Sequence, residues 1–189
     1  EYKEKIKACI KEVDKMNDMI EQLLILTRYE EGKSSLNYDY YSIEDIINNS
    51  VCLFSGMVME RKLNVSTSVS PQNITVYTDE YSLSTILNNL ISNAVKYCND
   101  EGSISINAYE ETNVLIIEIK NTGHGVPQEE LEAIFEKFYR SYASEKSEIK
   151  GFGLGLPIVK RFCSLLNIKM NITSELNLYT TVKLNIPLY

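Results

Sequence analysis

The sequence predicts an α+β fold in which a mostly antiparallel sheet is covered by helices on one face and preceded by a long amphipathic helix. Residues 1–31 lack Gly and Pro and carry apolar residues at helical spacing. From residue 36 onward, short segments of alternating apolar and polar residues recur, with turn residues between them. Helices and strands fall in separate runs, which is typical of a sheet with helices on one face.

The composition is that of a folded globular protein. Of the 189 residues, 44% are hydrophobic and 24% are charged, which leaves room for one ordinary domain and a smaller appendage. The net charge of -7 repels phosphate backbones and no long Lys/Arg run offsets it, so we expect no nucleic-acid partner. The four cysteines form no CxxC pair, and we expect them to be reduced thiols in the core.

The first helix carries a stripe wide enough for a helical bundle. Its apolar residues recur in a heptad-like pattern: Ile6, Cys9, Ile10, Val13, Met16, Ile20, Leu23 and Leu24. A single helix of this length is marginal in water, so the stripe must pack against another chain or against sequence outside this one. The linker 32–35 follows, and we expect two domains, 1–35 and 36–189.

The second domain is expected to begin with a strand at 36–41 and a helix capped by Ser42, with Asp45 three residues later. Two alternating segments, 63–69 and 74–78, then flank a turn and predict a short strand pair. A helix over residues 80–97 follows.

The remainder predicts two hairpins separated by a long loop and a helix. The first hairpin joins 104–108 to 114–119, and the last joins 169–173 to 181–186. Residues 123–153 carry Gly, Pro and a charged middle, so we expect a functional loop with a short helix at 128–135. A helix over 155–166 follows this loop.

One face of the helix at 80–97 is polar. Its residues Asn89, Asn93, Lys96 and Tyr97 are spaced i, i+4, i+7 and i+8 and therefore share one side. Amide oxygens suit Mg²⁺, and a lysine supplies a point charge for phosphate. A merely solvated helix face is the alternative interpretation of the same pattern.

Two glycine-rich segments accompany this helix. The sequence Asn-Thr-Gly-His-Gly-Val begins at Asn121 after a predicted strand, and glycines at 151, 153 and 155 stand directly before a helix. Such glycines allow close approach of a ligand to the backbone, and the helix N-terminus offers N–H groups to a phosphate. A flexible turn is the alternative for either segment alone.

Taken in order, these motifs resemble those of sensor histidine kinases. The asparagine helix, the Asn-Thr-Gly-x-Gly segment, the run Phe-Glu-Lys-Phe-Tyr-Arg at 135–140 and the Gly-x-Gly-Leu-Gly-Leu segment resemble the four nucleotide-binding boxes of that family. The resemblance extends over 36–189. The helix before it resembles the second helix of the family's dimerisation and phosphotransfer hairpin.

This resemblance implies a Bergerat-type site for ATP and Mg²⁺. It implies that Asn93 holds Mg²⁺ and that Asn89 assists at the metal or the phosphates, with a catalytic role. Lys96 would pair with phosphate, and Tyr97 would lie along the nucleotide. Arg140 would stabilise charge on the transferred phosphoryl group.

The resemblance also implies a mobile lid at about 126–150 and a loop that closes over adenine. Phe135 and Phe138 would anchor the lid on the core. The remaining residues implied in nucleotide binding are Asn121, Gly123, Gly125, Val126, Gly151, Gly153, Leu154, Gly155 and Leu156.

Two amides distinguish this sequence within the wider superfamily. Related ATPases place Glu at the position of Asn89, and an amide cannot act as a general base, so we expect slow ATP hydrolysis. Sensor histidine kinases usually have Asp at the position of Asn121. An amide there weakens adenine binding, and it either relaxes base selectivity or leaves it unaltered.

The chain lacks a phosphoacceptor motif. Its only histidine, His124, lies in the glycine loop, so we expect the acceptor histidine upstream of this sequence. The expected partners are an upstream dimerisation helix, a second protomer and a response regulator. No apolar stretch reaches the roughly 20 residues that span a bilayer; we expect a cytoplasmic portion of a membrane-anchored protein. The alternatives are a degenerate pseudokinase that acts as an interaction module and a serine kinase resembling anti-sigma factors.

Overall fold

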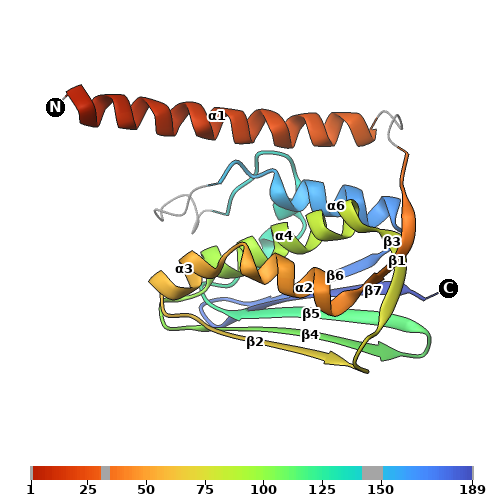
Figure 1. The fold of residues 1–189 in the computed structure, drawn as a ribbon. Coiled ribbons are helices and arrows are strands. Elements are labelled where there is room, and N and C mark those ends of the chain that lie inside the picture. The colour runs from red at the N-terminus through yellow and green to blue at the C-terminus, as the bar shows by residue number, and fades with distance from the viewer. Residues whose placement is uncertain (1, 31–34, 142–150, 189) are drawn as a thin grey trace. The chain divides into compact units, whose positions relative to one another are not determined.

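The computed structural model describes residues 2–30, 35–141 and 151–188 (Figure 1). The chain divides into two units, Glu1–Ser35 and Leu36–Tyr189. Within the described residues, no helix combines the length and the apolar character needed to cross a membrane.

The first unit contains one helix, α1 (Tyr2–Glu30). Its apolar residues are between 49% and 61% exposed at six positions with helical spacing: Ile6, Ile10, Val13, Met16, Ile20 and Leu24. Glu30 closes the helix directly before the linker. The amphipathic helix is therefore present, and its apolar stripe faces solvent in this chain.

The second unit carries the rest of the secondary structure. In chain order its elements are β1 (Tyr38–Ser42), α2 (Ile43–Cys52), α3 (Ser55–Glu60), β2 (Asn64–Ser70), β3 (Thr75–Asp79), α4 (Glu80–Tyr97), β4 (Ser103–Glu111), β5 (Val114–Thr122), the 3₁₀ turns η1 (Gln128–Glu130) and η2 (Ala133–Phe135), α6 (Gly155–Leu165), β6 (Lys169–Glu175) and β7 (Tyr179–Pro187).

The main sheet has five strands in the order β2-β4-β5-β7-β6. Only the β2–β4 pair is parallel, and the other neighbours are antiparallel. The hairpin between β4 and β5 turns at Thr112 and Asn113, both with positive φ, which matches the twist of the strands. The predicted α+β fold with a mostly antiparallel sheet is confirmed.

Helices α2, α4 and α6 cover one face of this sheet (Figure 1). Strands β4 and β5 alternate, and their inward side chains meet the apolar side of α4. The fully buried residues at this contact include Leu83, Ile86, Leu87, Ile104, Ile106, Leu115, Ile117 and Ile119. Burial of about 25 cal/mol per Å² of apolar surface makes this layer the main source of stability.

The N-terminus of α4 is fixed by a buried carboxylate. The side chain of Asp79 accepts the Ser82 N–H at 2.8 Å through Oδ1 and the Asn37 N–H at 2.9 Å through Oδ2. Asp79 thus caps α4 and ties it to the segment before β1. In the same way Ser42 caps α2 by accepting the Asp45 N–H at 3.2 Å, as the sequence predicts.

Two predictions about the elements and one about the cysteines are wrong. Segments 63–69 and 74–78 do not pair with each other, because β2 lies beside β4 in the main sheet whereas β3 pairs with β1. The helix expected at 128–135 consists of two 3₁₀ turns. Of the four cysteines, only Cys98 and Cys163 are buried, whereas Cys9 and Cys52 are exposed.

Candidate functional site

The polar residues of α4 lie on the side of the helix opposite its buried side. Asn89, Asn93, Lys96 and Tyr97 are all half-buried, whereas the opposite side of the helix is fully buried. Half-buried polar side chains on a helix that packs in the core are able to contact a ligand or a loop. The predicted helix is present, so these four residues share one face of it.

Asn89 contacts the start of α6. Its amide nitrogen donates to the Thr85 carbonyl oxygen at 2.8 Å, and its Oδ1 accepts no hydrogen bond from the described residues. A β-carbon added to Gly155 would lie 3.0 Å from that Oδ1. Glycine at 155 therefore allows α6 to begin directly against the polar face of α4.

The N-terminus of α6 has no side-chain cap. Its N-cap residue is the buried Leu154, and the third helical residue is Pro157, which has no N–H. In the described residues, the first amides of α6, those of Gly155 and Leu156, have no side-chain acceptor. These N–H groups and the positive end of the helix dipole form an anion-binding arrangement.

Lys96 supplies a cation on the same polar face of α4 as Asn89. Its ammonium group makes neither a hydrogen bond nor an ion pair with any residue that the structure describes. Burial lowers the pKa of Lys96 from its ordinary value of 10.5, because removal from water disfavours the charged form. A half-buried ammonium without a partner is costly unless an anion joins it.

Asn121 lies at the end of β5, where it is 5% exposed and pairs with Ile104 and Thr180. Its amide nitrogen donates to the Thr122 carbonyl oxygen at 3.0 Å. Its Oδ1 accepts no hydrogen bond from the described part of the chain. The polar atom that Asn121 offers to a ligand is therefore an acceptor.

The glycine loop that follows β5 runs close to two other backbones. A β-carbon on Gly123 would lie 2.0 Å from the Tyr97 carbonyl oxygen, and one on Gly125 would lie 2.3 Å from the Glu175 carbonyl oxygen. Gly125 also has a φ of 67°, which a side chain rarely adopts. Both glycines are thus required by the path of the loop between α4 and the β6–β7 turn.

Ser174 in β6 holds the end of this loop and was not predicted from the sequence. Its Oγ accepts the Val126 N–H at 2.8 Å and donates within β7, to the Tyr179 carbonyl oxygen at 2.8 Å or the Thr180 Oγ1 at 2.9 Å. Val126 precedes Ser174 by 48 positions. No local pattern reports such a contact.

The segment at 135–140 packs against the second glycine turn. The Phe138 N–H donates to the Gly153 carbonyl oxygen at 3.0 Å, and a β-carbon on Gly153 would lie 2.6 Å from the Tyr139 carbonyl oxygen. The Phe138 side chain is 53% exposed, so it does not anchor the loop on the core as predicted. Phe135 is half-buried, with the Lys160 Nζ 5.6 Å from the centre of its ring.

The remaining predicted residues lie at the edge of this segment. Arg140 is half-buried near the end of the described part of the loop, and Gly151 begins the next described part with open space where a side chain would stand. Residues 142–150 of the predicted lid lie outside the described residues.

Together these segments place an amide face, a cation, an uncapped helix N-terminus and an acceptor with no donor among the described residues in one unit. Helix α4 supplies Asn89, Asn93 and Lys96, α6 supplies its first amides, and β5 supplies Asn121. The arrangement is suited to a ligand with a polyanionic end and an aromatic amine end.

The Ser174 contact predicts a local loss of protection from hydrogen exchange. Ser174→Ala removes the acceptor of the Val126 N–H, so we expect exchange at that amide to accelerate by at least about ten-fold. Hydrogen-exchange mass spectrometry of peptides covering 123–126 measures this, with Ser68→Ala on an exposed position of β2 as the control. Unchanged exchange at Val126 would show that Ser174 does not hold the loop.

Comparison with known proteins assigns the family. Residues 78–189 match the family described as histidine kinase-, DNA gyrase B-, and HSP90-like ATPase. Sensor protein RprX of Bacteroides fragilis (strain YCH46) is 27% identical over 179 residues, which are 94% of this chain and 34% of the relative. The autoinducer 2 sensor kinase/phosphatase LuxQ of Vibrio vulnificus (strain YJ016) is 30% identical over 176 residues, 89% of this chain and 20% of the relative.

Solved structures share the fold. The histidine kinase AdeS of Acinetobacter baumannii superposes with a TM-score of 0.80 at 21% identity, covering 97% of this chain and 83% of that one. The catalytic domain of histidine kinase ThkA gives a TM-score of 0.71 at 20% identity, covering 81% and 97% of the two chains. The chain spans only 20% to 34% of the length of the two curated relatives above.

The family model covers more than half of the chain, and it includes α4, the glycine loop and α6. The curated relatives that match along nearly the whole chain carry the names of sensor proteins and sensor kinases. The chain therefore belongs to the histidine kinase-, DNA gyrase B- and HSP90-like ATPase family, and its second unit is a catalytic ATP-binding domain of the sensor histidine kinase type.

Proposed function

We propose that this chain binds Mg-ATP and donates the γ-phosphoryl group to a histidine outside this sequence, for relay to a response regulator. The observation that carries the proposal is the uncapped start of α6 against the amide of Asn89. This helix N-terminus lies against the polar face of α4, which also carries Lys96, a half-buried lysine with no partner among the described residues. The combination suits phosphate groups.

The oxygen donors available at this site fit Mg²⁺ held partly by the nucleotide. The described residues contain no group of three His, Cys, Asp or Glu side chains suited to a metal ion. Asn93 has an amide that makes no hydrogen bond with the described residues, and Mg²⁺ accepts one or two protein oxygens alongside phosphate oxygens and water. When bound, the ion neutralises charge on the phosphates.

The chain's own residues then bind and orient the nucleotide. Asn121 offers Oδ1 to the adenine amino group, and Lys96 pairs with the phosphates. The first amides of α6 stabilise negative charge on the phosphate oxygens. Arg140 approaches the transferred group from the loop and stabilises charge that develops on it.

Asn89 favours phosphoryl transfer to a protein nucleophile over hydrolysis. Its nitrogen is held by the Thr85 carbonyl oxygen, and its Oδ1 is the oxygen of a neutral amide. Such an oxygen does not take a proton from water at neutral pH, whereas a carboxylate can. The site is therefore suited to holding ATP intact until an acceptor arrives. An inert interaction module would need none of these features.

The proposed acceptor and partners lie outside this chain. His124 is exposed in the glycine loop, and its backbone oxygen accepts the Asn177 N–H at 2.7 Å, so its backbone is held by the β6–β7 turn. The exposed stripe of α1 fits an upstream dimerisation helix and a second protomer. We further propose that the full-length protein is anchored in a membrane, with this portion in the cytoplasm.

The first prediction concerns Lys96. Lys96→Met should weaken ATP binding by about 10- to 100-fold, because a charge-assisted contact with phosphate is lost. In the unaltered chain, affinity should fall as pH rises through the pKa of Lys96, since only the ammonium form attracts phosphate. The lowered pKa places the onset of this loss below 10.5.

Isothermal titration calorimetry with ATP and Mg²⁺ between pH 7 and 10 measures both effects. The matched control is Lys120→Met, since Lys120 is exposed and lies over the ring of Tyr179. No ATP binding by the unaltered chain, or equal affinity of the Lys96 variant, would overturn the proposed site.

The second prediction concerns turnover without an acceptor. We expect phosphate release below about 0.01 s⁻¹, the range of nucleotide sites that lack an efficient base. A coupled phosphate assay measures this rate, and Asn93→Ala verifies that any signal originates from this site. Turnover above about 1 s⁻¹ would instead indicate a dedicated ATPase.

The third prediction concerns base selectivity, which the sequence left open at Asn121. Rotation of the amide would break the bond to the Thr122 carbonyl oxygen, so the acceptor orientation is favoured and ATP should be preferred over GTP. Asn121→Asp should strengthen ATP binding about five-fold through a charged acceptor. Titrations of ATP and GTP into both proteins test this, and equal affinities for the two nucleotides would contradict it.

A further inference from the structure

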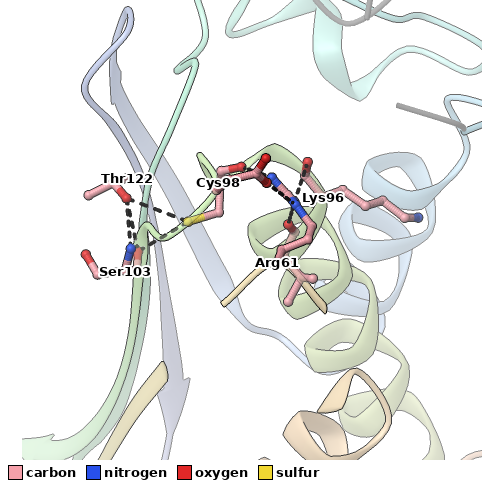
Figure 2. A network of polar contacts seen from close by, with 7 residues as sticks. Arg61, Lys96, Cys98, Ser103 and Thr122 are labelled. Atoms are coloured by element: carbon pink, nitrogen blue, oxygen red, sulfur yellow. Dashed lines mark hydrogen bonds and ion pairs between the residues drawn. The ribbon is translucent and has the colours of Figure 1, made fainter. Parts of the chain in front are cut away.

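Arg61, between α3 and β2, binds the C-terminal end of α4 (Figure 2). Its Nη1 donates to the Val95 carbonyl oxygen and, at 3.3 Å, to that of Lys96, and its Nη2 donates to the carbonyl oxygen of Cys98. Its Nε donates to the Asp100 carboxylate at 2.7 Å. One guanidinium thus satisfies three backbone oxygens where the helix ends.

These oxygens need an external donor. The last carbonyls of a helix have no partner within it, and they carry the negative end of the helix dipole. The C-cap residue Cys98 is extended, and its N–H donates to the Ala94 carbonyl oxygen, so no glycine cap follows. Arg61 supplies that donor from a different part of the chain.

The turn that Arg61 holds carries two of the proposed ATP-binding residues, Lys96 and Tyr97. Figure 2 shows the Lys96 side chain extending away from the Arg61 guanidinium, whose contact is with the Lys96 backbone. The Tyr97 carbonyl oxygen faces Gly123, and the following residue, Cys98, bridges to Gly123. The position of this turn therefore determines where Lys96 lies and where the glycine loop begins.

The positive charge of Arg61 at the end of α4 affects the binding of a phosphate ligand in particular. A triphosphate near Lys96 lies close to the negative end of α4, which repels it. The guanidinium donates hydrogen bonds to those carbonyl oxygens, and its delocalised positive charge offsets their negative charge. Its partner Asp100 is 77% exposed, so that ion pair alone contributes little. The contacts with the helix oxygens remain as the main role of Arg61.

We propose that Arg61 is a positioning residue for the phosphates of the nucleotide. It fixes the last turn of α4, and it offsets the dipole of that helix so that Lys96 can receive a polyanion. The inference rests on the proposed ATP site and adds a residue that touches neither the nucleotide nor its reacting atoms.

The test compares ATP with adenosine, which shares the base and lacks the phosphates. Arg61→Met should weaken ATP binding by about 10- to 100-fold and adenosine binding by less than about three-fold. Arg61→Lys should recover part of the ATP affinity, because an ammonium keeps the charge but cannot reach all three oxygens. Calorimetry provides the six dissociation constants, those of ATP and adenosine for the unaltered chain and for the two Arg61 variants.

Lys62→Met is the matched control. It removes one positive charge from the adjacent position, where Lys62 pairs with Glu101 at 3.6 Å and both side chains are exposed. Its ATP affinity should equal that of the unaltered chain. Asp100→Asn should also leave ATP affinity within about three-fold, because the carbonyl contacts remain.

The outcomes distinguish a positioning role of Arg61 from a purely structural role and from no role. Equal losses for ATP and adenosine in the Arg61 variants would show a purely structural residue, and no loss would show no role; either result overturns the inference while the ATP site stands. If Arg61→Met does not fold, the ATP-to-adenosine comparison in Arg61→Lys decides in the same way. Absence of ATP binding by the unaltered chain overturns the proposed function itself, and this role with it.

Discussion

The structure depends on one constraint, which is that α4 buries one side against the sheet while its other side stays half-open. Leu87 and Ile91 are sealed in the core, whereas Asn89 and Asn93 lie on the open side of the same helix. The large apolar contact with β4 and β5 fixes the helix rigidly. Every other part of the site is placed relative to that helix, including the start of α6, the glycine loop and the segment at 135–140.

The two amides of the site, Asn89 and Asn121, are oriented in the same manner. Each donates its nitrogen to a nearby backbone oxygen, that of Thr85 or Thr122, and each leaves its Oδ1 without a partner in the described residues. An amide can present either its nitrogen or its oxygen to a ligand. Here the backbone oxygens bind both nitrogens, so both side chains present their oxygen as an acceptor. In a chain with a net charge of -7, the neutral amide of Asn89 also avoids adding repulsion toward the phosphates.

Local signals predicted the elements well, and contacts between distant segments were missed. Helical periodicity predicted α4 with the bounds that the structure shows, and the β4–β5 hairpin follows from alternation around one turn. The pairing of 63–69 failed because parallel pairing with β4 bridges an intervening strand and helix. Arg61 and Ser174 were missed for the same reason: each acts on backbone groups more than thirty residues away, where no spacing rule applies.

The β6–β7 hairpin has a consequence for the order in which the molecule matures during synthesis. Strand β7 lies between β5 and β6 in the sheet, and the glycine loop is held by Ser174 of β6 and by Leu178 of the turn before β7. Ribosomes add residues from the N-terminus, so α4 emerges long before the strand that completes its sheet. A nascent chain that has not reached Tyr179 lacks the strand that holds Ser174, so the support of the glycine loop is still incomplete.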